Sequence, residues 1–373
     1  MSLFCIPNAL QIDMDDMGWF CGKDERAEGG PSRTGIPRRH AVADYTAVNE
    51  LGRRLGMKIN CAFVIGEWDP DNRLASIPYL SRYGDAWDNA SHLDRDLLRA
   101  CVDEVNRSEY INLCVHGLLH GYYKPGVDWH DTSDFYYRVN KELLMTPEDE
   151  VRRRLDAFFG LLRDHGVKKR VNTFIPPSFA YRFDELSHIL VDYGIEYVGT
   201  IFGTMASAGT PPTAPIDIEP CGIVTYDRHH NPLPWDAFGG EWEELPPLFG
   251  LIGVHWPNFL HADPERNLET VDRAEAYFRR SAAQFGTILS RDVAFYASQE
   301  LYKRFAAVEE TGDTLSVDLS ALPKTHGVKD RFYVSAKGEI TSAEGCSASV
   351  YEKMSDFVTY EIIPSESRVI LRA

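Results

Sequence analysis

The sequence predicts an α/β protein in which βα units surround a parallel sheet or barrel, followed by a small β-rich C-terminal unit. Short apolar, β-rich runs alternate with helical patterns over the first two hundred residues. Polar residues follow several of these runs, at the strand ends where α/β folds usually build their sites. From about residue 312 the pattern changes to the two-residue alternation of antiparallel strands. We therefore divide the 373 residues into a barrel domain, 1–311, and a small β-rich region, 312–373, packed on it.

The elements of the barrel domain follow from hydrophobic periodicity and from helix capping. The first helix carries apolar residues three or four apart from Val42 to Leu55, and a later one opens with Thr146 as N-cap and Pro147 in its first turn. Strands are expected at 9–14, 58–65, 110–115, 170–175, 195–200 and 248–255. Helices are expected at 39–55, 93–106, 147–165, 184–193 and 270–289. In the C-terminal region, strands are expected at 314–319, 331–335, 347–351, 358–363 and 368–371.

Composition excludes several classes of partner. The formal net charge of −17 argues against binding to nucleic acid or to an anionic membrane surface. No apolar run approaches the roughly 20 residues that span a bilayer, and the first residues lack the pattern of a secretory signal. The seven cysteines are scattered without CxxC pairing, which is typical of reduced, buried thiols. We expect a cytoplasmic protein.

Two histidines four residues apart, His116 and His120, follow the apolar strand 110–115. If the chain turns helically after the strand, both imidazoles can face one cation, at about 2.0–2.1 Å if it is zinc. The alternative is that one histidine caps the strand and the other is a satisfied core residue. The pair therefore predicts a metal site only if further ligands lie close to it.

Further polar groups follow other predicted strands. Asp15 and Asp16 end the first strand, and His255 ends a late one. Two histidines and one carboxylate satisfy a catalytic divalent metal, which keeps open positions for water and substrate. A second carboxylate can act as general base, and a histidine on the opposite side can protonate the leaving group. This is the inventory for metal-assisted hydrolysis of an amide or ester, although the aspartates alone could be a helix cap and His255 alone a core residue.

In their order and spacing over roughly residues 9–290, these motifs resemble the polysaccharide deacetylases, the NodB-homology family known as carbohydrate esterase family 4. The resemblance implies a deformed (β/α) barrel of the glycoside hydrolase/deacetylase type. It implies Asp15 as general base and His255 as general acid. It also implies one divalent metal, zinc by ligand type with cobalt, nickel or manganese also fitting, held by Asp16, His116 and His120.

Two features depart from the family pattern. Met17 separates the aspartate pair from Gly18, and the arginine that usually precedes the proline motif and orients the base is absent. Phe174 and Ile175 stand in its place, and Arg182 is a candidate from the same loop.

The expected function is removal of an N- or O-acyl group from a glycan or amino sugar. A backbone N–H near Pro177 and Ser178 would stabilise the oxyanion, and Trp19 and Trp256 would stack on sugar rings. These aromatic residues could equally plug the core or form oligomer contacts. Two alternatives remain: another metal-dependent hydrolase or carbohydrate-active enzyme on a similar barrel, or a degenerate, non-catalytic glycan-binding protein.

Overall fold

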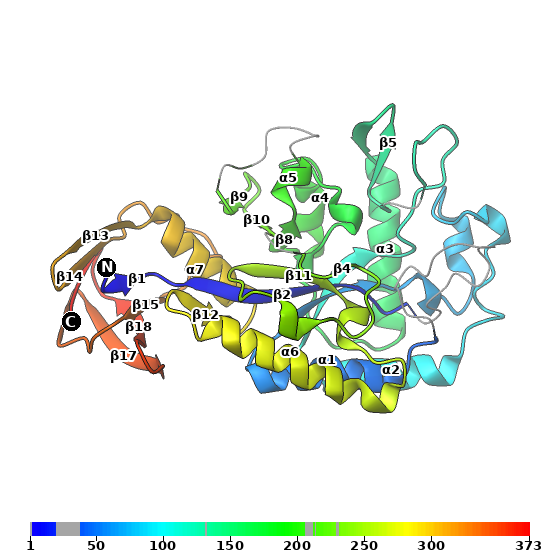
Figure 1. Cartoon of the computed structure of the whole chain (residues 1–373). Coiled ribbons are helices and arrows are strands. Elements are labelled where there is room, and N and C mark those ends of the chain that lie inside the picture. Colours follow the sequence, from blue (N-terminus) through cyan, green and yellow to red (C-terminus); the bar gives the residue numbers. More distant parts are fainter. Residues whose placement is uncertain (1, 20–37, 131–132, 206–211, 213, 229–230) are drawn as a thin grey trace.

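The larger unit of the computed structural model is a parallel sheet curled into an incomplete barrel (Figure 1). The structure describes residues 2–19, 38–130, 133–205, 212, 214–228 and 231–373. In spatial order the strands are β11 (Leu251–His255), β2 (Asn8–Met17), β3 (Ile59–Val64), β4 (Ile111–Gly117), β7 (Thr173–Phe174), β8 (Tyr197–Thr200), β10 (Val224–Asp227) and β9 (Ile216–Ile218). All neighbours are parallel except β10 and β9.

The barrel is deformed at β2, its first and longest strand. The first half of β2 pairs with β12 (Thr287–Leu289), and its second half pairs with β11. Among the described residues no backbone ladder joins β10 to β11, so the barrel stays open there. The predicted deformed (β/α) barrel is confirmed.

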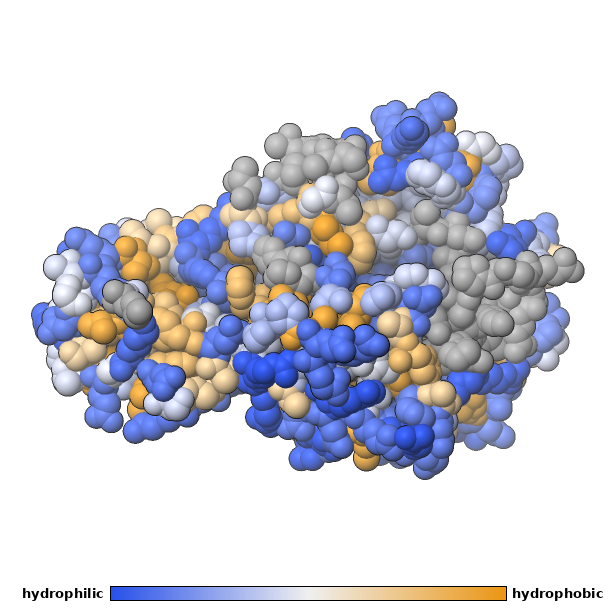
Figure 2. All heavy atoms as spheres, viewed as in Figure 1, coloured by the Kyte–Doolittle hydropathy of each residue, from blue (hydrophilic) through white to orange (hydrophobic). Residues whose placement is uncertain are grey.

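Helices cover the outer face of the curled sheet in two groups (Figure 1), and buried residues of both groups belong to one hydrophobic core. One group contains α1 (Val42–Leu55), α2 (Arg95–Arg107) and α6 (Asn267–Ala282). The other contains α3 (Glu148–Asp164), α4 (Ser187–Leu190) and α5 (Phe202–Met205), with the hairpin β5 (Tyr136–Val139) and β6 (Glu142–Met145) above α3. The hydrophilic side chains of the α6 and α1 layer face solvent along the lower edge of the molecule in Figure 2.

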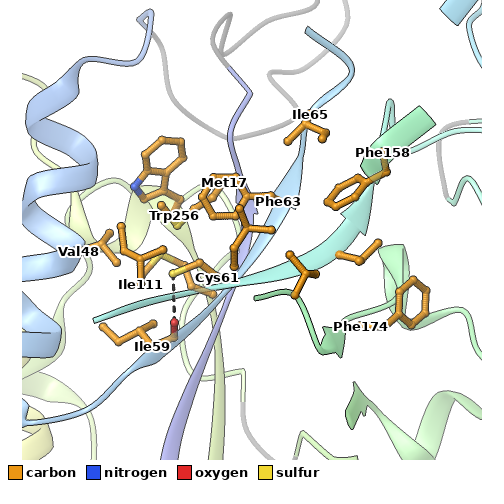
Figure 3. Packing of buried hydrophobic residues seen from close by; sticks show 14 of the residues in the cluster. Met17, Val48, Ile59, Cys61, Phe63, Ile65, Ile111, Phe158, Phe174 and Trp256 are labelled. Carbon is orange, nitrogen blue, oxygen red and sulfur yellow. Dashed lines mark hydrogen bonds between the residues drawn. The ribbon is translucent and has the colours of Figure 1, made fainter. Parts of the chain in front are cut away.

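Strand alternation divides apolar from polar side chains. Ile59, Cys61 and Phe63 of β3 pack with α1 in the main hydrophobic core (Figure 3). Because successive side chains of a strand point to opposite faces, Asn60 and Ala62 face the barrel interior instead. The same alternation on β2 turns acidic side chains toward that interior.

The C-terminal unit consists of two four-stranded antiparallel sheets. One contains β1 (Phe4–Cys5), β15 (Phe332–Ala336), β18 (Val358–Pro364) and β17 (Cys346–Lys353), and the other β13 (Ala307–Thr311), β14 (Thr314–Asp318), β19 (Arg368–Arg372) and β16 (Ser342–Glu344). The unit has its own apolar core, and α7 (Val293–Phe305) connects it to the barrel. Since β13 pairs with β14 and β1 with β15, the sheets include residues from Ala307 onward and the N-terminal strand, whereas the predicted division lies at 311.

The sequence-based elements differ from the structure in the second half of the barrel domain. The helix predicted over 270–289 ends at Ala282, and its last three residues form β12. Gly286, at φ +92°, makes the turn that separates the two elements. Strand 170–175 is reduced to Thr173–Phe174, and α7 and β10 were not predicted.

Two further observations concern the cysteines and the possibility of a membrane-spanning helix. The six cysteines that it describes are all free thiols, as their scatter predicted, and Cys21 lies outside the described residues. No helix in the described part of the chain combines the length and apolar character needed to cross a bilayer.

Candidate metal centre and active site

Asp16, His116 and His120 come together at the carboxyl end of the sheet. Their ligand atoms all lie within 4.8 Å of one another, and the first two residues are buried. Nε2 of His116 lies 3.4 Å from Oδ1 of Asp16, and the two imidazole centroids are 5.2 Å apart. Residues 100 positions apart in sequence meet because β2 and β4 flank β3 in a parallel sheet, which places their carboxyl ends at one edge. The structure therefore brings the three predicted metal ligands together.

Local backbone strain accompanies two of these ligands. Asp16 has φ +67° and lies within a register shift, between Met14 and Met17, in the pairing of β2 with β3, and His120 has φ +54°. Non-glycine residues adopt this left-handed region at a cost of about 1–3 kcal/mol, and such strain is concentrated at functional sites. The irregular backbone at Asp16, near the end of β2, accompanies the approach of its carboxylate to His116.

The ring of His116 is fixed by the neighbouring strand. Its Nδ1 lies 2.6 Å from the carbonyl oxygen of Ile175, so Nδ1–H donates there and Nε2 faces Asp16. Such an outer hydrogen bond is the usual support of a metal-ligating histidine.

Electrostatics strengthen the same pairing. Burial raises the pKa of Asp16, but the hydrogen bond with His116 and the charges of His120, His116 and His255 outweigh burial and hold the pKa well below its usual range. Burial lowers the pKa of His116, but the Asp16 hydrogen bond and the charges of Asp15 and Asp16 raise it overall.

Asp15 lies beside this centre and is held by Arg228, a residue that the sequence analysis missed. Nη1 of Arg228 donates to both carboxylate oxygens of Asp15, at 2.9 and 2.8 Å, and both side chains are buried. Arg228 directly follows β10, so it crosses the gap where the barrel is open. Gly253 of β11 provides the room, since a Cβ there would lie 2.2 Å from Nη2 of Arg228. Arg182, the candidate from sequence, pairs with Glu185 at 3.5 Å.

His255 reaches the centre from the other side. Its Cα pairs in register with that of Asp15, and its Nε2 lies 3.8 Å from Oδ2 of Asp15 and 4.0 Å from Oδ2 of Asp16. Asn258 fixes the turn after His255, because its Oδ1 accepts from the His255 N–H at 2.8 Å. Nδ2 of Asn258 donates to the carbonyls of Pro234 and Ala237, at 3.0 and 2.9 Å. This anchors the loop of Trp235, a residue 39% exposed whose ring centroid is 6.5 Å from that of His255.

A polar layer lies beneath the two catalytic candidates. Asp13, two residues before Asp15 on β2, is fully buried, and its Oδ1 accepts from Nδ2 of Asn60 at 2.7 Å. Asn60 in turn accepts from Asn112 on β4 at 2.8 Å. Burial raises the pKa of Asp13 to about 7, against the lowering effect of Arg228. The floor of the site is thus hydrogen-bonded from strand to strand.

The structure corrects two of the predicted substrate contacts. Trp256 is fully buried and packs edge-to-face on His40 and Tyr45, with ring centroids 4.2 and 4.8 Å apart, so the prediction that it stacks on a sugar is wrong. Trp19 is 4% exposed and offers no face to a ligand either. Trp256 belongs to the main hydrophobic core, and Trp19 is buried as well.

The proline loop lies where the sequence placed it. Pro177 is buried and Ser178 is exposed after the end of β7, and Ser178 and Phe179 have φ +52° and +55°. The ring of Phe179 packs under the guanidinium of Arg228, 4.7 Å from its centroid. The loop therefore supports the arginine that holds Asp15, while an oxyanion-binding role of Pro177 and Ser178 stays a prediction.

The donor set fits a catalytic divalent metal. Two imidazoles and one carboxylate match the ligands of catalytic zinc, which keeps coordination positions open for water and substrate. Asp16 and His116 are buried, and the His116 ring is held by its hydrogen bond to the Ile175 carbonyl. Asp15 and His255 lie next to this set without belonging to it.

Comparison with known proteins gives distant matches only. No protein-family model matches the sequence, and no curated protein is similar enough to match. Among solved structures, a mutant of a CE4 family pseudoenzyme with restored enzymatic activity matches with 13% identity and a TM-score of 0.35 over 77% of this chain and 66% of that one, just under two thirds of its length.

Two further structures illustrate the range of matches. A family 4 carbohydrate esterase from Streptomyces lividans, in complex with acetate, matches with 11% identity and a TM-score of 0.32, covering 76% of this chain and 92% of that one. A candidate glycoside hydrolase/deacetylase from Parabacteroides distasonis matches with 10% identity and a TM-score of 0.41, covering 88% and 79%. At these levels of similarity, function has to be argued from the side chains of the site itself.

Proposed function

We propose that this chain is a metal-dependent hydrolase of the polysaccharide deacetylase type, which removes an N- or O-acyl group from a glycan or amino sugar. One juxtaposition supports the proposal. Asp16, His116 and His120 form a set that could bind a metal. Nε2 of His255 lies 3.8 Å from the second carboxylate, that of Asp15, and 4.0 Å from Asp16. A metal site with an adjacent base and acid provides the groups that metal-assisted hydrolysis needs.

Asp16, His116 and His120 would hold the divalent ion, zinc by ligand type, with cobalt, nickel or manganese compatible with the same donors. When bound, the ion would supply Lewis acidity and lower the pKa of water. Arg228 keeps both oxygens of Asp15 in place, so that Asp15 can take a proton from the attacking water.

The remaining steps need a proton donor and a substrate platform. The water oxygen bonds to the acyl carbon, and the bond from that carbon to the sugar nitrogen or oxygen breaks. Nε2 of His255, which opposes Asp15 across 3.8 Å, gives its proton to the leaving amine or hydroxyl group. Trp235, exposed beside His255, is the aromatic residue we propose for stacking on the sugar in place of Trp19 and Trp256.

Metal content and acetate release test the proposal. Wild type should hold about one equivalent of zinc or cobalt, and His120→Ala should lose both metal and acetate release from acetylated sugars. His188→Ala is the matched control, because that imidazole is 53% exposed and lies on α4.

Each contrary outcome favours one alternative. Wild type that binds neither zinc nor cobalt would contradict the proposal and favour a glycan-binding protein without catalysis. Metal binding with cleavage of a different bond would favour another carbohydrate-active hydrolase.

A further inference from the structure

A single buried carboxylate, that of Asp134, accepts hydrogen bonds from the turn that carries His120. Its Oδ2 accepts from the Leu118 N–H at 2.7 Å, and its Oδ1 accepts from the N–H groups of Gly121 at 3.3 Å and Leu119 at 3.4 Å. These amides flank His120 on both sides, and Asp134 is fully buried. Bonds to an ionised acceptor are stronger than neutral ones. The conformation of the turn is therefore tied to one side chain.

The backbone of the turn leaves space for the Asp134 carboxylate only because residue 117 is glycine. Gly117, directly after His116, has φ +146°, and a Cβ there would lie 1.9 Å from Oδ2 of Asp134. A side chain at 117 and the carboxylate cannot occupy the same space. His120 has the left-handed φ of +54°, which the surrounding contacts have to maintain. Three amide bonds to one acceptor supply such contacts.

Asp134 is itself held in place. Its carbonyl accepts from Oγ1 of Thr146 at 3.3 Å, and Oγ of Ser133 accepts from the two N–H groups that follow Asp134. Burial raises the pKa of Asp134, while the charge of the buried Arg154 and the three amide bonds oppose that rise. Arg154 also lies over the ring of Tyr122, 5.4 Å from its centroid. We call Asp134 and its three amide hydrogen bonds to the 118–121 turn the clamp. Its interactions with Arg154 and Thr146 attach the clamp to α3 and to the base of the β5–β6 hairpin.

We propose that Asp134 is a positioning residue of the metal centre, which fixes the 118–121 turn so that His120 stands beside His116 and Asp16. The inference rests on the proposed function, since it assigns the ligand set to a metal. Asp134 acts through the backbone amides, with no ligand atom in the set itself.

Asp134→Asn tests the clamp through two measurements. The variant loses the charge and presents an amide N–H to backbone N–H groups. Competition with a chromophoric chelator should show zinc binding weakened about 10- to 100-fold, the usual effect of losing an outer support. In the metal-free protein, hydrogen exchange of the Leu118, Leu119 and Gly121 amides should accelerate about tenfold or more.

Glu219→Gln is the matched control. Glu219 is equally buried, with Oε1 accepting from Oη of Tyr181 at 2.6 Å and Oε2 from the Asp184 N–H at 2.7 Å, away from the metal ligands. It should lose stability but keep the zinc affinity and the exchange rates of the 118–121 turn. Equal zinc affinity in Asp134→Asn and in this control would overturn the proposal.

Two further outcomes remain decisive. If wild type binds no zinc, the metal centre of the proposed function fails, and unchanged exchange of the three amides in Asp134→Asn would overturn the clamp as well. If Asp134→Asn does not fold, Gly117→Ala replaces it, because the new methyl group must displace the carboxylate. Zinc binding as tight as wild type in Gly117→Ala would then contradict the inference.

Discussion

Arg228 donates from one nitrogen, Nη1, to both oxygens of Asp15, at 2.9 and 2.8 Å, from a strand on the far side of the barrel opening. Nη2 of the same guanidinium lies 3.5 Å from the carbonyl oxygen of Asp13. The expected arginine before the proline loop is missing, yet the carboxylate proposed as base has a cationic partner. This partner, Arg228, directly follows β10, and Gly253 on β11 leaves the space for its guanidinium.

Replacing Arg228 with methionine should lower kcat about 100-fold, because a misplaced base costs about that much, while zinc affinity stays near wild type. Removal of one partner of a buried ion pair should also cost about 3–5 kcal/mol of unfolding free energy. Steady-state kinetics, zinc titration and urea unfolding check these effects.

Two variants separate positioning from folding in that experiment. Asp15→Asn added to Arg228→Met should recover stability without recovering activity, since no unpaired charge remains. Arg182→Met should leave kcat unchanged, because Arg182 pairs with Glu185. A kcat for Arg228→Met equal to that of Arg182→Met would contradict the role of Arg228.

Hydrophobic periodicity and strand-end polar residues predicted βα units around a parallel sheet or barrel and the five central side chains, whereas the deformed barrel was implied by the family resemblance. These side chains lie at or just after the carboxyl ends of apolar strands, and parallel strands place such residues at one edge. They are Asp15, Asp16, His116, His120 and His255. Arg228 and Asp134 could not be predicted this way. β10 has four residues within a Gly- and Pro-rich stretch, and Asp134 acts through tertiary contacts on a turn whose hydrogen-bonded residues lie 13 to 16 positions earlier.

The burial of Trp256 could have been predicted from its position directly after His255. His255 ends β11 with its side chain toward the site, so the next residue points to the opposite face, where the helices pack. The exposure of Trp235 and the anchoring of its loop by Asn258 depend on tertiary contacts. No pattern in the sequence distinguishes Trp235 from the other tryptophans.

Trp235→Ala should raise KM for an acetylated chito-oligosaccharide about three- to tenfold with kcat little changed, as expected for loss of one aromatic contact. The reason is its exposed ring beside His255. Trp256→Phe is the comparison, and it should lower stability and leave KM unchanged because that indole is in the core. The same KM for Trp235→Ala and wild type would remove Trp235 from the substrate site.

Asp13 should contribute a loss of stability as pH rises from about 4 to about 7. Its pKa is raised from 3.8 to about 7, so the folded state holds a proton that the unfolded state has lost. This contribution is complete below the unfolded pKa and disappears as pH passes the folded pKa. Asp13→Asn should flatten that part of the profile, which urea unfolding at several pH values measures. An unchanged slope would show that Asp13 is already ionised in the fold.

The junction between barrel and C-terminal unit should depend on Gln299 of α7. Its Nε2 donates to the carbonyls of Pro7 and Tyr333, both at 3.1 Å, and its Oε1 accepts from the Tyr333 N–H at 3.0 Å. Gln299→Leu would leave these buried backbone groups unpaired, at about 1–3 kcal/mol for each group. Thermal and urea unfolding should therefore show a loss of at least about 2 kcal/mol, with zinc affinity retained because the metal ligands lie elsewhere in the barrel.

Gln284→Leu, at an exposed position with one local hydrogen bond at 3.2 Å, should change stability little. Equal stability of the two variants would mean that water replaces the side chain of Gln299, so that this residue does not stabilise the junction.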